Sequence, residues 1–352
     1  MSAVSTTGLR PLAITMGDAA GIGPEIIAKA YLQQPALMRG AVVIGDVACM
    51  RRAAAALLAP GVPALPILRL ETPLNAQALP PRCIPVLQQG EELGSVAPGQ
   101  VSALAGRFAG SCVLRAAELA LQGAVAGIVT APLHKEALHA GGSPFDAYPG
   151  HTEMLQDAAA RYLGQAGLPV RMMLANEELR TVLVSIHVSL RQAIEAVNFD
   201  NVLQTLRITH DALSRILGRV PRIAVAGLNP HAGEGGLFGT EERDIILPAM
   251  QAARAHGCDL SGPWPPDTVF MRARKRAGHL AEFDVVVAMY HDQGLIPVKY
   301  LGVESGVNVT LGLPFVRTSP DHGTAFDIAG SGRADPASFL AAVQMARQLI
   351  CP

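Results

Sequence analysis

Three histidines follow three apolar runs of the chain. His187 comes after TVLVSI, His231 after RIAVAGLNP and His291 after VVVAMY. Ligands of α/β sheets bind at the carboxyl ends of the strands, where three imidazoles can hold a divalent cation and leave positions open for substrate oxygens. The alternative is that each histidine only caps a strand or bonds a loop carbonyl. The surroundings NPHAGEGG and YHDQG favour the metal site.

A second group of residues is suited to anions. Residues 150–152 (GHT) predict a turn that offers an imidazole and a hydroxyl, and Lys299, Asn308 and Arg317 lie in a stretch that is otherwise apolar and Gly-rich. A cation buried there needs an anionic partner, and arginine and lysine suit phosphate or carboxylate. The alternative for each long side chain is that its charged end reaches the surface.

Two carboxylates lie in loops near the predicted strand ends. Asp267 is in PPDTVF, and Asp292 is adjacent to His291. Either can ligate a metal, orient an imidazole or move a proton. The Gly-rich segment GDAAGIGPE matches neither G-x-G-x-x-G nor the P-loop pattern, so by itself it is weak evidence for a nucleotide site.

The elements that must position these residues alternate along the chain. Over 53–82 we expect a short helix followed by irregular chain. A hairpin is expected around the turn Asn-Glu-Glu at 176–178. The alternation predicts an α/β fold with a largely parallel sheet and some antiparallel pairing in its middle. The expected strands are 12–15, 41–46, 125–130, 171–175, 180–186, 222–228, 284–290 and 307–311; the expected helices begin at Pro24, cover 109–122 and 199–217, begin near Thr240 with Glu241 and Glu242 in the first turn, and begin at Pro336 after an Asp335 cap.

Composition excludes several classes of partner. The 352 residues are 50% hydrophobic, carry a net charge of -1 and include 4% aromatics, which gives no basis for binding nucleic acid or an anionic membrane. Five dispersed cysteines indicate reduced thiols. The start of the chain has no signal-peptide pattern, and the apolar runs are only strand-length, so we expect a soluble, cytoplasmic protein.

Taken together, the motifs resemble the 4-hydroxythreonine-4-phosphate dehydrogenase family of pyridoxine (vitamin B6) biosynthesis. The resemblance implies the two-lobed fold of isocitrate and isopropylmalate dehydrogenases, with a cleft between the lobes. One lobe would comprise 1–145 and 312–352 with the cofactor loop, and the other 146–311 with the metal ligands and dimer contacts. The stretches that carry the resemblance to this family run from residue 14 to residue 330: ITMGDAAGIGPEI, TAPLHKEAL, YPGHTE, GLNPHAGEGGLFGTEE, PPDTVF, AMYHDQGLIPVK and GVNVTLGLPFVRTSPDHGTAFDIAG.

The resemblance also implies a role for each candidate residue, a nicotinamide cofactor and a homodimer with a shared site. A carboxylate at the adenosine ribose favours NAD over NADP, and imidazoles suit zinc, cobalt or manganese better than magnesium. By position, the metal ligands are His187, His231 and His291; the substrate contacts are His151, Thr152, Lys299, Asn308 and Arg317; the catalytic acids near the reacting carbon are Asp267 and Asp292; and the cofactor contacts, in DHGTAFDIAG, are His322, Gly323 and Asp327.

Two departures from the family pattern bear on the substrate. Ala19 stands where the family has proline, which changes loop stiffness more than chemistry. The stretch between Lys135 and His151 is longer than we expect of the biosynthetic enzyme and resembles paralogues that act on threonate or erythronate 4-phosphate. A more distant branch oxidises a terephthalate-type cis-dihydrodiol.

The expected function is metal-dependent oxidation, with decarboxylation, of 4-hydroxythreonine 4-phosphate or a close four-carbon phospho-hydroxy acid. A metal-dependent lyase or hydrolase is the alternative from another enzyme class, and it has no use for DHGTAFDIAG. A non-catalytic sugar-phosphate sensor is a third, which would tolerate loss of the metal site. Metal, anion and proton-transfer groups together favour an enzyme.

Overall fold

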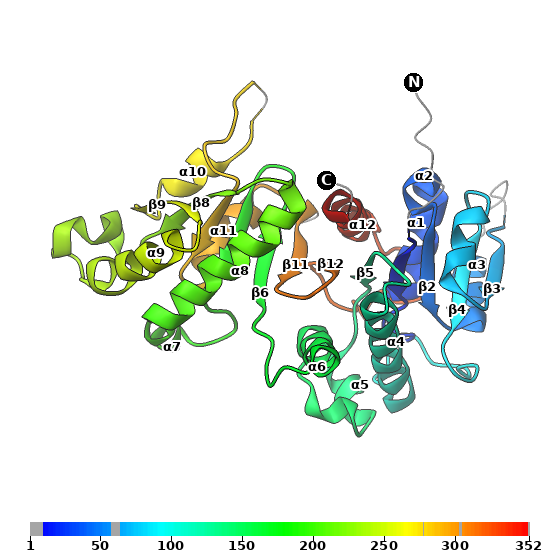
Figure 1. Ribbon diagram of the computed structural model, residues 1–352. Helices are drawn as coiled ribbons and strands as arrows, with labels where there is room; N and C mark the ends of the chain where they lie inside the picture. Colours follow the sequence, from blue (N-terminus) through cyan, green and yellow to red (C-terminus); the bar gives the residue numbers. More distant parts are fainter. Residues whose placement is uncertain (1–9, 58–63, 277, 303–304, 351–352) are drawn as a thin grey trace. The chain divides into compact units, whose positions relative to one another are not determined.

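The computed structural model describes residues 10–57, 64–276, 278–302 and 305–350 (Figure 1). The chain divides into two compact units, of which unit 1 comprises 1–168 with 313–350 and unit 2 comprises 169–312. The domain boundaries expected from the sequence, after residues 145 and 311, stay a prediction.

Unit 1 is built on a parallel sheet whose strands follow the order β3-β4-β2-β1-β5-β12. The residues of β1, β2 and β5 are all buried, as expected for parallel strands covered on both faces. The strands are β1 (Leu12–Thr15), β2 (Ala41–Gly45), β3 (Ile67–Leu70), β4 (Ile84–Gln88), β5 (Gly127–Thr130) and β12 (Val316–Pro320). The helices are α1 (Gly23–Gln33), α2 (Pro35–Met38), α3 (Val47–Ala56), α4 (Ala103–Leu121), α5 (Lys135–Ala140), α6 (His151–Leu163) and α12 (Ala337–Ile350), with 3-10 turns η1 (Pro73–Ala78) and η2 (Phe145–Ala147).

Helices α5 and α6 both pack on α4 in unit 1 (Figure 1). Glycine allows α4 and α5 to touch closely, because a Cβ on Gly106 would lie 1.9 Å from the carbonyl oxygen of Ala137. Any larger residue at position 106 would push the two helices apart. The start of α5 is therefore held firmly against the unit.

Unit 2 has strands in the order β11-β6-β7-β10-β8-β9. The pairs β11–β6 and β6–β7 are antiparallel, whereas β7, β10, β8 and β9 pair in parallel. The strands are β6 (Arg171–Ala175), β7 (Arg180–Leu183), β8 (Arg222–Ala226), β9 (Asp259–Trp264), β10 (Val285–Ala288) and β11 (Val307–Leu311). The helices are α7 (Leu190–Ala196), α8 (Phe199–Leu217), α9 (Leu247–Arg254), α10 (Val269–Ala273) and α11 (His291–Tyr300), with the 3-10 segment η3 (Pro230–Gly236) and the π-helical turn η4 (Glu242–Ile246).

The expected α/β fold with a mixed, largely parallel sheet is confirmed, including the hairpin of β6 and β7 and the Asp335 cap, which accepts a hydrogen bond from the N–H of Ala337 at 2.9 Å. Two local predictions were wrong. The region 53–82 contains the strand β3, whose Leu68 and Arg69 are exposed at the edge of the sheet, so it lacks a clear apolar pattern. Residues 150–152 are the start of α6 and not a separate turn.

Two findings bear on the chemistry of the protein as a whole. Over the residues that the structure describes, no helix is both long and apolar enough to cross a membrane. Cys49, Cys83, Cys112 and Cys258 are buried free thiols, and Cys351 lies outside the described residues.

Candidate active site

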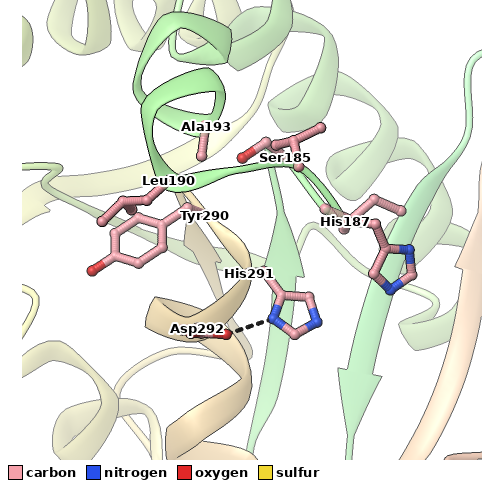
Figure 2. A pocket seen from close by; sticks show the side chains of 9 residues that line it. Ser185, His187, Leu190, Ala193, Tyr290, His291 and Asp292 are labelled. Carbon is pink, nitrogen blue, oxygen red and sulfur yellow. Dashed lines mark hydrogen bonds and ion pairs between the residues drawn. The ribbon is translucent and has the colours of Figure 1, made fainter.

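A cavity of about 380 Å³ in unit 2 contains two of the three predicted metal ligands (Figure 2). The rings of His187 and His291 lie side by side, with 5.6 Å between their centroids. They follow β7 and β10, which are parallel neighbours, so residues 104 positions apart reach the same edge of the sheet. We call this cavity the histidine pocket; it is lined by Ser185, Ile186, His187, Val188, Leu190, Ala193, Tyr290, His291 and Asp292.

Backbone hydrogen bonds hold the two histidine loops together. The N–H of Val184 donates to the carbonyl of Ala288 at 2.9 Å, and the hydroxyl of Ser185 donates to the carbonyl of Met289 at 3.1 Å. His187 itself has a φ of +38°, a conformation that costs a non-glycine residue about 1–3 kcal/mol and persists where the surroundings impose it. Strain of this kind is typical of functional sites.

Asp292 orients the imidazole of His291. Its carboxylate lies 2.7 Å from Nδ1 of His291 (Figure 2). A carboxylate there favours the tautomer with hydrogen on Nδ1, which leaves the lone pair of Nε2 for a cation. Two imidazoles with one oriented in this way suit zinc, cobalt or manganese, so the residues present fit part of a metal site.

His231 is held apart from this pair. Its side chain is 65% exposed, lies 3.2 Å from the Glu234 carboxylate and has the ring of Phe238 beside it at 6.0 Å. Within the described ranges, no group of three or more His, Cys, Asp or Glu side chains is close enough to hold one ion. One chain thus brings two predicted ligands together and leaves the third on a separate loop; its role as a ligand stays a prediction.

The loop that carries His231 has an unusual backbone. Five consecutive residues, His231 to Gly235, have φ between 43° and 82°, a left-handed turn that costs each non-glycine residue about 1–2 kcal/mol. Glu242 holds the base of this loop, because one of its buried carboxylate oxygens accepts the N–H groups of Leu228 and Asn229, both at 2.7 Å. The helix predicted to begin near Thr240 is present, because the chain is helical from Glu241 onward, with a π-helical turn at Glu242–Ile246 before α9. The N–H of Asp244 donates to the backbone carbonyl of Thr240 at 2.8 Å.

The other predicted residues of unit 2 do not line the histidine pocket. Asp267 is exposed just before α10, Lys299 lies at the far end of α11 from His291, and Asn308 is half-buried on β11 opposite Leu174. Their roles stay predictions.

Unit 1 gathers the remaining anion-binding candidates around a buried cation. Arg317 on β12 is only 3% exposed, and its Nη2 donates to the Thr130 hydroxyl on β5 at 2.8 Å. His151 begins α6, and Lys135 begins α5. We call Thr130, Lys135, His151, Thr152 and Arg317 the Arg317 cluster.

The electrostatics of the Arg317 cluster favour an anion. Burial, reinforced by the charges of Arg317 and Lys135, lowers the pKa of His151 to about 3, so its ring is neutral at pH 7. The cap residue of α6, Gly150, has no side chain to accept the first N–H groups of the helix, and these groups carry partial positive charge. Nε2 of His151 is buried without a hydrogen-bond partner. The cluster can hold a phosphate or a carboxylate.

The predicted cofactor loop packs on the Gly-rich turn after β1. The N–H of Ile22 donates to the carbonyl of Thr324 at 3.0 Å, and a Cβ on Gly21 would come within 2.9 Å of Thr324 Cβ. In this loop His322 has a buried Nε2 without a hydrogen-bond partner and Asp327 is exposed, which leaves donors and acceptors for a nucleotide. A cavity of about 310 Å³ adjoins the end of the loop at Gly330. The cofactor roles of His322, Gly323 and Asp327 stay predictions.

Sequence reasoning missed two residues that shape this part of unit 1. Asp18 is fully buried, its carboxylate accepts the N–H of Ala20 at 2.8 Å, and its own N–H donates to the carbonyl of Pro132 at 2.9 Å; burial raises the pKa of the carboxyl. It thereby ties the turn after β1 to the loop after β5. His134 stacks on Phe326 with 4.5 Å between the rings. The signal was present, because both loops follow apolar strands and carry a charged residue or an imidazole.

Comparison with known proteins shows which class of enzyme the chain belongs to. The chain is 55% identical to the 4-hydroxythreonine-4-phosphate dehydrogenase of Beijerinckia indica over 97% of its length and 96% of that protein. It is 46% identical to the D-threonate 4-phosphate dehydrogenase of Salmonella typhimurium over 97% and 99%. It is a dehydrogenase, an oxidoreductase that acts on CH–OH groups.

The family is equally clear. The model of the pyridoxal phosphate biosynthetic protein PdxA matches residues 38–346, and the chain belongs to this family. A crystal structure of 4-hydroxythreonine-4-phosphate dehydrogenase from Klebsiella pneumoniae is 43% identical, with a TM-score of 0.85 over 97% of this chain and 99% of that one. The terephthalate 1,2-cis-dihydrodiol dehydrogenase of Burkholderia xenovorans is 30% identical, with a TM-score of 0.66 over 97% and 98%. The resemblance found in the sequence is confirmed.

Proposed function

We propose that the protein oxidises the secondary hydroxyl of 4-hydroxythreonine 4-phosphate or of a close four-carbon phospho-hydroxy acid such as D-threonate 4-phosphate, in the cytoplasm. The hydride acceptor is NAD or NADP, and a divalent cation is required. The observation that carries the proposal is the pair of imidazoles, His187 and His291, that face one cavity beyond neighbouring parallel strands. The names of its relatives support the phosphorylated substrate.

His187 and His291 hold the cation, with His231 contributed by a second copy of the chain. A homodimer is supported by exposed apolar side chains on both parts of the divided site. Val188, Leu190 and Ile194 are 46–62% exposed at or beside the histidine pocket, and Leu237 and Phe238 are 73% and 49% exposed beside the His231 loop. Exposed patches of this kind are typical of protein interfaces.

A bound cation of this type polarises the substrate hydroxyl and lowers its pKa. The chain supplies the other components. Asp292 fixes the His291 ring, and Asp267, Asp292 or a water that they hold accepts the hydroxyl proton as hydride leaves the same carbon. Lys299 and Arg317 bind the phosphate and so set which carbon faces the nicotinamide, and His151, Thr152 and Asn308 contact the substrate. His322, Gly323 and Asp327 bind the adenosine, and the Asp327 carboxylate favours NAD.

A panel of substrates tests this function. Purified protein is stripped with a chelator and then assayed with zinc, cobalt, manganese or magnesium for reduction of NAD and NADP. The panel comprises 4-hydroxythreonine 4-phosphate, the threonate and erythronate 4-phosphates and a cyclic cis-dihydrodiol. We expect NADH only with a phosphorylated four-carbon acid and an added metal. A metal-dependent lyase or hydrolase would instead consume substrate without reducing the cofactor, and that result would overturn the proposal.

A further inference from the structure

The Arg317 cluster contains an acid as well as cations. The Glu153 carboxylate lies close enough to Arg317 to raise the pKa of its guanidinium, although burial outweighs this effect and leaves that pKa at about 10. Oε2 of Glu153 also lies 3.7 Å from the position of a Cβ on Gly150. With the His151 ring neutral, the charges of Arg317 and Glu153 cancel, and Lys135 and the partial charge at the start of α6 remain for an anion.

Lys135, at the start of α5, also lies beside Gly150, the cap residue of α6. Its Cε is 3.9 Å from the position of a Cβ on Gly150, so its side chain runs along the start of α6. Its charge also lowers the pKa of His151. Among the described residues, no acidic side chain forms an ion pair with Lys135, and the residue is exposed.

The backbone that carries Lys135 is firmly held. The loop before α5 is tied to the buried Asp18, whose N–H donates to the carbonyl of Pro132 at 2.9 Å, and α5 is pressed on α4 at Gly106. A flexible side chain on a rigid base suits the binding of a charged group that arrives with the ligand. Lys135 is thus placed where an anion on the α6 N-terminus would meet it.

We propose that Lys135 is a further phosphate-binding residue, which supplies the positive charge that adapts the Arg317 cluster to a phosphate monoester dianion. The inference rests on the proposed function. A phosphate is favoured over a carboxylate because the first N–H groups of α6, the Thr152 hydroxyl, Arg317 and Lys135 are more donors than two carboxylate oxygens can use. Without Lys135, the charges of the cluster and Glu153 cancel, and Lys299 of the proposed function would have to supply the net positive charge for a dianion.

Calorimetry with inorganic phosphate tests the proposal on the full-length protein without substrate. We expect Lys135→Met to weaken phosphate binding by about 10- to 100-fold, the loss typical of one charged hydrogen bond. The variant should raise KM for the phosphorylated substrate by a similar factor and leave kcat within about 2-fold. Lys135→Arg should retain most of the binding. Arg115→Met is the matched control, because it removes an exposed cation of α4 that pairs with Glu118 at 2.6 Å.

Three results would overturn the inference. If Lys135→Met binds phosphate normally while Arg317→Lys does not, the phosphate site stands and Lys135 is not part of it. If both variants bind normally, the phosphate site of the proposed function is itself wrong. A rise in KM for NAD(P) instead of for the substrate would assign Lys135 to the cofactor.

Discussion

The Arg317 cluster of unit 1 and the histidine pocket of unit 2 differ in how complete one chain makes them. Arg317 is buried, hydrogen-bonded to Thr130 and adjacent to a helix N-terminus. The histidine pocket is open, its flanking apolar residues are exposed, and the third predicted ligand lies on a strained loop elsewhere. Anion binding should therefore be a property of the single chain, whereas metal binding should depend on assembly.

Mixing two inactive variants tests whether metal binding depends on assembly, and it has the largest expected effect on turnover. His187→Ala and His231→Ala should each lower turnover by about 10³-fold or more, because a metal ligand is lost. In a homodimer with shared sites, refolding the two variants together at equal amounts should restore about 25% of the wild-type activity, since half of the dimers would carry one intact site. The measurement is NADH formation after co-refolding. Recovery of no activity would mean that one chain supplies all the ligands.

Arg317→Met tests the other side of the comparison. Loss of a buried cation that pairs with an anion costs about 2–5 kcal/mol of binding, so KM for the phosphorylated substrate should rise by about 30- to 5 × 10³-fold. Binding of zinc, measured by competition with a chromophoric chelator, should not change. Reduced zinc affinity in this variant would show that the two sites are coupled.

Glu242→Ala should destabilise the loop that carries His231. The substitution leaves the N–H groups of Leu228 and Asn229 without their acceptor, and buried donors without partners cost about 1–3 kcal/mol each. We expect the free energy of unfolding, from urea titration, to fall by about 2–4 kcal/mol. Arg243→Met, which removes an exposed side chain from the same π-helical turn, is the control and should lower the free energy of unfolding by far less.

The smallest expected effect is a pH dependence at His151. Burial holds its folded pKa at about 3, below the ordinary value of 6.5, so the stability that it contributes is present above pH 6.5 and is lost as the pH falls toward 3. Between pH 7.5 and pH 5 the free energy of unfolding of the wild type should fall by about 1–2 kcal/mol more than that of His151→Asn. Urea unfolding at pH 7.5 and pH 5 measures this, with the exposed His256→Asn as control. Parallel pH profiles for wild type and His151→Asn would contradict the assignment.

The sequence pattern predicted an element correctly where that element depends on its own residues and not on tertiary contacts. The amphipathic α8, the β6–β7 hairpin and the helix cap at Asp335 were predicted. The edge strand β3 was missed because its exposed Leu68 and Arg69 break the apolar pattern. The helix start near Thr240 was predicted, but the π-helical turn at Glu242–Ile246 was not, because it depends on the contact between the buried Glu242 and the loop before His231.

The amino-acid sequence by itself determined the fold class, the family and the residue types able to bind a metal and an anion, because these depend on local pattern and on side-chain chemistry. Only the tertiary structure decided which of them are neighbours. His187 meets His291 because β7 pairs with β10, and Lys135 meets the start of α6 because α5 and α6 both pack on α4. Strand order and helix packing follow from burial of the whole core, which no single motif encodes.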